Sequence, residues 1–243
     1  MNIQELAVSE RLICALDTAD IDEVKAIIEE LDGVVSFFKI GITLHLASGL
    51  EIVKLLLESN KRVFLDLKYY DISETVEQAV REAAKLGVTF LTVHGNSEII
   101  RGAVRGKGDS PLQILLVTVL TSLDQEDLEE MGYKVPLEEL VLTRAKNGLK
   151  YGANGVISSA HEAGIIKGET ENKLLVISPG IRDEDAPSDD QKRKMSADSA
   201  IKAGADFLVV GRPITNPQDG KTRREAAQSI IEKMEQGFTS GAS

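Results

Sequence analysis

Tryptophan is missing from this sequence, and aromatic residues make up only 4% of its 243 residues. We therefore expect a core that is aliphatic and tightly packed. Cys14 is the single cysteine, which excludes an intramolecular disulfide and any metal site built from several cysteines. Because Cys14 lies in an apolar run, we expect a buried structural thiol rather than a nucleophile.

Long apolar runs are also missing, and the first ten residues are polar and acidic, unlike a signal peptide. We therefore expect a cytoplasmic protein without a membrane segment. Basic residues are outnumbered, with 28 Lys and Arg against 39 Asp and Glu and a net charge of −11. That balance argues against nucleic acid or an anionic membrane surface as the main partner. A small anionic substrate stays compatible with it, because a local cluster of Lys and Arg can outweigh a distant negative surface.

Short apolar runs alternate with longer amphipathic stretches along the chain. Eight runs predict buried strands: 12–16, 37–40, 62–67, 90–93, 114–119, 155–157, 174–177 and 207–210. Helical periodicity predicts helices in 21–31, 49–58, 73–86, 137–151 and 196–203. Three of these helix-to-strand joints contain a glycine, at Gly87, Gly152 and Gly204, where a left-handed residue ends a helix.

This alternation predicts an α/β fold with a parallel sheet and helical crossovers. Eight strand–helix units in 243 residues match a closed (β/α)8 barrel, a single domain over 1–243 with a frayed tail from about residue 237. An open, doubly wound sheet is the alternative. It is weakened because the turn after the first strand, 17–20, contains no glycine.

The most informative segment is the end of the third predicted strand. Asp66, Lys68 and Asp71 place two carboxylates and one ammonium within six residues, which is costly in one cleft unless the charges pair. Asp66 and Lys68 are expected on the same face, because strand side chains repeat every second residue. This arrangement suits a site that handles a charged substrate and delivers a proton.

In a (β/α)8 barrel the active site lies at the carboxyl ends of the strands. The other polar residues at the predicted strand ends are Asp17, Lys39, His94, Thr121, Ser122, Ser178, Arg182 and Arg212. Several have structural alternatives: Asp17 can cap a helix, Lys39 can pair with an aspartate, and Thr121 or Ser122 can cap a helix that begins near 125. His94 is expected to be a structural strand-end histidine rather than a catalyst.

The loops after the seventh and eighth strands point to a phosphate. Barrels commonly bind phosphate with these two loops. Gly180 and Gly211 permit close backbone approach, and Arg212 can grip phosphate oxygens with its fork of donors. The polar segment 182–194 reads equally well as a mobile lid or as a plain solvated loop.

Together these motifs resemble the orotidine 5′-monophosphate decarboxylase family. The pattern Asp-x-Lys-x-x-Asp-Ile-x-x-Thr runs from Asp66 to Thr75, Pro-Gly-Ile-Arg ends at Arg182, and Gly-Arg-Pro begins at Gly211. The resemblance extends from Leu12 to about Ile230. It departs from the family pattern at Tyr69-Tyr70 and Ser73-Glu74, and Gly95 stands where alanine is commoner.

The resemblance implies a decarboxylase that needs no cofactor and no metal, in pyrimidine nucleotide synthesis. It implies that Lys68 is the proton donor, working with Asp66, Asp71 and Lys39. It implies substrate contacts from Asp17, Lys39, Asp66, Asp71, Ile72, Thr75, Thr121, Ser122, Pro179, Arg182, Gln191, Gly211 and Arg212. It also implies a homodimer in which Asp71 and Thr75 reach the partner's site.

Two other functions stay open from the sequence. A metal-dependent sugar-phosphate decarboxylase or hexulose-phosphate synthase on the same barrel needs an acidic metal ligand at the end of the second strand, where this chain has Lys39. A non-catalytic barrel that binds nucleotide phosphate needs the Gly211-Arg212 loop but has no use for Lys68 between two aspartates.

Overall fold

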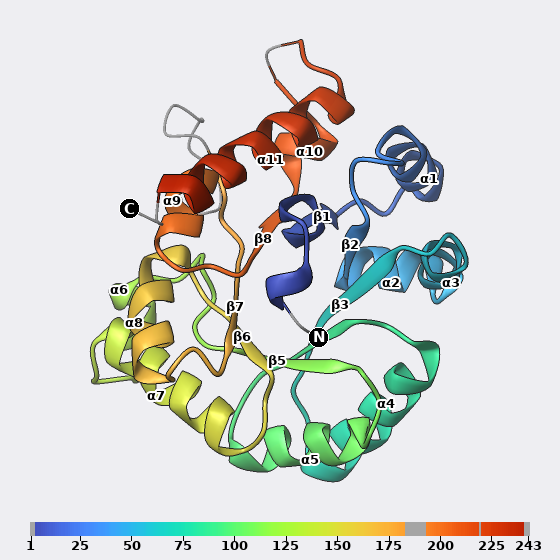
Figure 1. Ribbon diagram of the computed structural model, residues 1–243. Helices are drawn as coiled ribbons and strands as arrows, with labels where there is room; N and C mark the ends of the chain where they lie inside the picture. The colour runs from blue at the N-terminus through green and yellow to red at the C-terminus, as the bar shows by residue number, and fades with distance from the viewer. Residues whose placement is uncertain (1–2, 183–192, 219, 241–243) are drawn as a thin grey trace.

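The computed structural model describes residues 3–182, 193–218 and 220–240. Its centre is a closed barrel of parallel strands in sequence order, with β8 paired back onto β1 (Figure 1). The strands are β1 Leu12–Leu16, β2 Phe37–Gly41, β3 Arg62–Tyr69, β4 Phe90–Val93, β5 Gln113–Val117, β6 Gly155–Ile157, β7 Leu175–Ser178 and β8 Phe207–Val210. The predicted (β/α)8 barrel is confirmed, and every predicted strand overlaps an observed one.

Helices surround the barrel on its outer side (Figure 1). They are α1 Ile21–Glu30, α2 Ile42–Ser48, α3 Glu51–Glu58, α4 Ser73–Leu86, α5 Ser97–Lys107, α6 Gln125–Glu130, α7 Leu137–Lys150, α8 Ala163–Glu169, α9 Ala197–Lys202, α10 Arg212–Thr215 and α11 Arg223–Ser240, with short 3-10 helices η1 Ile3–Glu5, η2 Val8–Arg11 and η3 Ala160–Glu162. In the parts of the chain that the structure describes, no helix has both the length and the apolar character needed to cross a membrane.

Local sequence explains where these helices begin and end. In α4, apolar side chains three and four residues apart are buried: Val76, Val80 and Ala83. The three predicted glycine joints all have positive φ, +83° at Gly87, +91° at Gly152 and +105° at Gly204.

The last helix of the chain reaches into the segment where we expected a frayed tail. Helix α11 continues through Ser240, past the point near residue 237 where we expected a frayed tail to begin. Gly237 lies against α9, where an added Cβ would be 2.7 Å from the Asp198 carbonyl oxygen. The Phe238 ring lies under the Arg11 guanidinium at 4.7 Å. These contacts give the last helical turn a surface to pack on.

The core has two parts of different composition. The layer between strands and helices is mainly aliphatic, as predicted. The barrel interior differs from the prediction, because Phe37, Phe64, Phe90 and Phe207 form a cluster there with ring centroids 5.0–6.1 Å apart. Inward positions of a barrel must be filled by side chains alone, and bulky rings fill that space with few residues.

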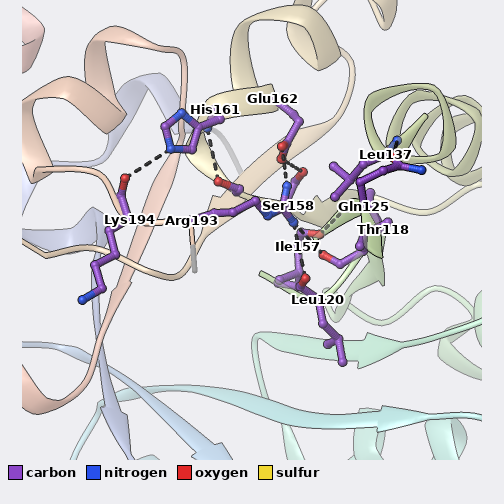
Figure 2. A network of polar contacts seen from close by, with 12 residues as sticks. Thr118, Leu120, Gln125, Leu137, Ile157, Ser158, His161, Glu162, Arg193 and Lys194 are labelled. Carbon is purple, nitrogen blue, oxygen red and sulfur yellow. Dashed lines mark hydrogen bonds and ion pairs between the residues drawn. The ribbon is translucent and has the colours of Figure 1, made fainter. Parts of the chain in front are cut away.

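The ends of β5, β6 and β7 are tied together by polar contacts (Figure 2). The Arg193 guanidinium forms an ion pair with Glu162, which also accepts a hydrogen bond from the Ser158 hydroxyl at 3.1 Å. Arg193 also donates to the carbonyl oxygens of Val119 at 3.5 Å and Leu120 at 3.4 Å. One side chain from the segment after β7 therefore holds the loop that follows β5.

We predict that Glu162→Gln lowers the free energy of unfolding by about 3–5 kcal/mol, because it leaves a buried guanidinium without its counter-ion. Urea unfolding followed by circular dichroism measures the change. Glu171→Gln is the control, since Glu171 pairs with Lys173 in full contact with solvent and should leave stability unchanged. Equal stability of the two variants would contradict a structural role for the Arg193–Glu162 pair.

Candidate active site

A cavity of about 620 Å³ opens at the carboxyl ends of the barrel strands. Most of the residues predicted for the site line it together: Asp17, Lys39, Asp66, Lys68, Thr121, Ser122, Pro179, Arg182, Gly211 and Arg212. They come from the ends of β1, β2, β3, β5, β7 and β8. The barrel thus brings together residues that are far apart in the sequence, as its topology requires.

Four charged side chains form a chain across one side of this cavity. The Lys39 ammonium donates to Asp17 Oδ1 at 2.7 Å and lies 3.7 Å from Asp66 Oδ2. The Lys68 ammonium donates to Asp66 Oδ1 at 2.8 Å. Exposure of the side chain rises from 9% for Lys39 to 15% for Asp66 and 31% for Lys68. Each of these charges therefore has an opposite charge beside it, and Lys68 is the more exposed of the two lysines.

The backbone at Lys68 departs from a regular strand. Its φ is +47°, in the left-handed region that residues with a side chain rarely adopt. Leu65 pairs with Leu91 and Tyr69 pairs with Val93, so residues 66–68 of β3 stand opposite Thr92 alone on β4. The bulge directs Lys68 toward the cavity. Backbone conformations of this rare kind are common at functional sites.

Thr92 is a polar residue that the sequence analysis missed. It is fully buried, and its hydroxyl donates to Asp66 Oδ1 at 3.0 Å while it accepts the Lys68 backbone N–H at 2.9 Å. It sits inside the apolar run of β4, two residues before the strand-end position His94. The shift in strand register between β3 and β4 brings Thr92 next to Asp66 and Lys68. No sequence pattern predicted that shift.

The loops that follow β7 and β8 bring glycines and arginines to the cavity, and β8 is the neighbour of β1 in the closed barrel. Gly180 has a φ of +79°, and Gly211 precedes Arg212, the first residue of α10. The Arg182 guanidinium donates to the Ile181 carbonyl oxygen at 2.8 Å, and the Arg182 N–H donates to the Met195 carbonyl oxygen at 3.0 Å. The cavity is lined by cations here although the whole chain is acidic.

Other predicted residues lie outside this cavity. Asp71, Ile72 and Thr75 are exposed to solvent in the single chain, and Asp71 accepts a hydrogen bond from the backbone N–H of Ile72 at 2.6 Å. Gln191 and most of the segment 182–194 lie outside the described residues. His94 does not line the cavity, and its ring lies edge-on to Tyr70. Burial, with smaller contributions from Arg144 and Lys68, lowers the pKa of His94 and favours a neutral ring.

Asp17, Thr121 and Ser122 had a structural alternative as helix caps, and the structure shows that other residues cap these helices. Asp20, not Asp17, caps α1 by accepting from the backbone N–H groups of Asp22 and Glu23, each at 3.0 Å. Asp124 caps α6, so neither Thr121 nor Ser122 is needed there.

Cys14 is fully buried, and burial raises the pKa of its thiol to about 12. Its thiol therefore stays protonated at neutral pH, as expected for a structural cysteine.

Comparisons with known proteins identify the family of this chain. The family profile described as "Orotidine 5'-phosphate decarboxylase / HUMPS family" matches residues 10–229. A protein of Nitrobacter winogradskyi named orotidine 5′-phosphate decarboxylase is 48% identical over 225 residues, 93% of this chain and 92% of its own length. A protein of the same name from Methylococcus capsulatus is 45% identical over 238 residues, 97% of this chain and 96% of its own.

A solved structure gives the same result. The orotidine 5′-phosphate decarboxylase of Lactobacillus acidophilus superposes with a TM-score of 0.80 at 32% identity, covering 93% of this chain and 99% of that one. This chain therefore belongs to the orotidine 5′-phosphate decarboxylase / HUMPS family.

Proposed function

We propose that this protein converts orotidine 5′-monophosphate to uridine 5′-monophosphate and CO₂, with Lys68 as proton donor and without a metal or cofactor. The observation that carries the proposal is the ion pair of Lys68 with Asp66 at the end of β3, inside a cavity lined elsewhere by arginines. The names of relatives that match along most of their length support the substrate.

The proposed reaction breaks the bond between C6 of the pyrimidine and its carboxylate carbon. CO₂ departs, the electron pair of the broken bond stays on C6, and the Lys68 ammonium gives C6 a proton. The carbanion is stabilised by a positive charge already in place beside it, which is the most effective form of electrostatic catalysis. Asp66 holds that ammonium at 2.8 Å and stands close to the departing carboxylate. Water then reprotonates Lys68.

The rest of the substrate spans the cavity. Asp17 and Lys39 are placed to hold ribose hydroxyls, Thr121 and Ser122 to contact the ring, and Gly211 and Arg212 to bind the phosphate. Pro179 and Arg182 lie on the same side as Arg212, and the resemblance adds Gln191 to the phosphate contacts. Binding energy from the distant phosphate is available to orient the ring at Lys68.

The family description covers a second activity, and one residue discriminates against it. A magnesium-dependent sugar-phosphate enzyme needs acidic ligands that converge on a cation. The end of β2 carries Lys39, whose ammonium occupies the space between Asp17 and Asp66. Among the described residues, no three His, Cys, Asp or Glu side chains gather as metal ligands. These observations favour the decarboxylase over the metal enzyme.

We also propose that the protein acts as a homodimer. Four large apolar side chains are exposed, namely Ile42, Leu46, Tyr70 and Ile72, with Leu46 at 85% and Ile72 at 71%. These residues follow the neighbouring strands β2 and β3, at the end of the barrel that carries the cavity. Large exposed apolar side chains grouped in this way mark association surfaces. Asp71 lies between two of them, so association would carry its carboxylate toward a partner's site.

We predict rapid conversion of orotidine 5′-monophosphate by the purified protein, followed by ultraviolet absorbance and unchanged by EDTA. Lys68→Ala should lower kcat by roughly 10³-fold or more, because it removes both the proton and the stabilising charge. Lys85→Ala, on the exposed face of α4, is the control and should match the unaltered protein. Conversion that requires Mg²⁺ would contradict the metal-free mechanism, and near-normal turnover by Lys68→Ala would remove Lys68 from the chemistry.

A complementation experiment tests the shared site. Lys68→Ala and Asp71→Ala proteins should each be nearly inactive alone. Random mixing of their subunits should restore about a quarter of the sites, because half of the dimers then contain one site with both residues intact. Mixing Lys68→Ala with the double variant Lys68→Ala/Asp71→Ala is the control and should restore nothing. If the first mixture also stays inactive although subunits exchange, Asp71 acts within its own chain.

A further inference from the structure

We propose that Thr92 is a positioning residue that holds the catalytic lysine and its carboxylate partner in their reactive arrangement. The kinetic test of this positioning role rests on the decarboxylase reaction proposed above. Thr92 is not among the residues that line the cavity. It acts through Asp66 and Lys68, and it does so with a single hydroxyl group.

The first step of the argument is the hydrogen bonding of Lys68. At the bulge, residues 66–68 face only Thr92, so the regular ladder of backbone hydrogen bonds between β3 and β4 is interrupted. The Lys68 N–H instead donates to the Thr92 hydroxyl oxygen at 2.9 Å. A backbone N–H without a partner in this partly buried place is costly, so the hydroxyl stabilises the left-handed conformation at Lys68.

The second step concerns the side chains. The same hydroxyl has one proton to donate, and it lies 3.0 Å from Asp66 Oδ1 but 3.5 Å from the Leu65 carbonyl oxygen. Asp66 Oδ1 is also the atom that accepts from the Lys68 ammonium at 2.8 Å. Thr92 thus holds the backbone N–H of Lys68 and also the Asp66 oxygen that accepts from the Lys68 ammonium.

This double contact makes the hydroxyl, rather than the size of the side chain, the important property. Valine has the shape of threonine and suits a buried strand, but it can neither accept from Lys68 nor donate to Asp66. Serine keeps the hydroxyl and loses only a methyl group. The pair of substitutions therefore separates hydrogen bonding from packing.

The experiment measures kcat and KM for orotidine 5′-monophosphate in Thr92→Val and Thr92→Ser. We expect Thr92→Val to lower kcat roughly 10- to 100-fold, as loss of a hydrogen bond to a charged group predicts, while KM changes by no more than about threefold. Thr92→Ser should restore kcat to within about threefold of the unaltered protein. Thr170→Val is the matched control, because Thr170 is equally buried but donates only to the Ile166 carbonyl oxygen in α8.

Several results would overturn the proposal. A normal kcat in Thr92→Val would overturn it. A kcat in Thr92→Ser as low as that in Thr92→Val would also overturn it, because packing rather than the hydroxyl would then explain the loss. A loss in Thr170→Val equal to that in Thr92→Val would show a general loss of stability. If Thr92→Val does not fold, Thr92→Ala takes its place against Thr92→Ser.

Crystal structures of the unaltered and Thr92→Val proteins separate this proposal from the proposed function. If the unaltered protein does not decarboxylate orotidine 5′-monophosphate, the proposed function fails, and the structures alone decide the role of Thr92. We expect Lys68 in Thr92→Val to leave the positive-φ region and its ammonium to lose contact with Asp66. An unchanged φ and an unchanged ion pair would overturn the positioning role whatever the substrate.

Discussion

The carboxylate of Asp66 lies between two ammonium groups, and the arrangement of the cavity depends on this contact. Neither lysine would stay charged at low cost in a partly buried place without a nearby anion. Lys39 on β2 and Lys68 on β3 approach different oxygens of the same carboxylate, at 3.7 Å and 2.8 Å. Asp17, the residue that follows β1, also pairs with the Lys39 ammonium, at 2.7 Å. Three neighbouring strands therefore end in one alternating row of charges, which a closed barrel holds at fixed spacing.

A local break in the sheet orients Lys68 toward Asp66 within this row of charges. If β3 continued regularly, Lys68 would follow the pleat of the strand and its N–H would bond within the ladder. The extra residues opposite Thr92 instead let Lys68 adopt φ +47° and point its ammonium back at Asp66, two residues earlier. Two contacts compensate for the strained conformation: a hydrogen bond to the backbone N–H of Lys68 and an ion pair to its side chain. Strain that is compensated in this way persists only where the surrounding structure determines it fully.

Sequence reasoning predicted the eight strands, the barrel and most of the residues that line the cavity, because strand periodicity and strand-end polarity are local signals. It also placed Asp66 and Lys68 on one face, although the contact between them depends on a bulge that alternation does not predict. Thr92 and Arg193 were missed for a related reason. Thr92 acts through atoms on another strand and Arg193 through the loop after β5, in each case more than 20 residues away in the sequence, and no local pattern reports that pairing. The phenylalanine cluster was hidden because a low total of aromatic residues does not reveal how they are concentrated.

The two sides of the cavity are held by different means, and this difference bears on how the site works. The charge chain on β1–β3 is fixed by short ion pairs between strand ends, which leave little freedom to its members. The loop leading to Thr121 and Ser122 is held through its backbone, by Arg193 on the carbonyl oxygens of Val119 and Leu120. In the proposed reaction a carbanion forms beside the Lys68 ammonium, so rigidity at that ammonium matters most, since misplacement by about 1 Å can cost roughly 10²-fold in rate. The ion pairs therefore act on the Lys68 ammonium directly, whereas the loop leading to Thr121 and Ser122 is held through its backbone.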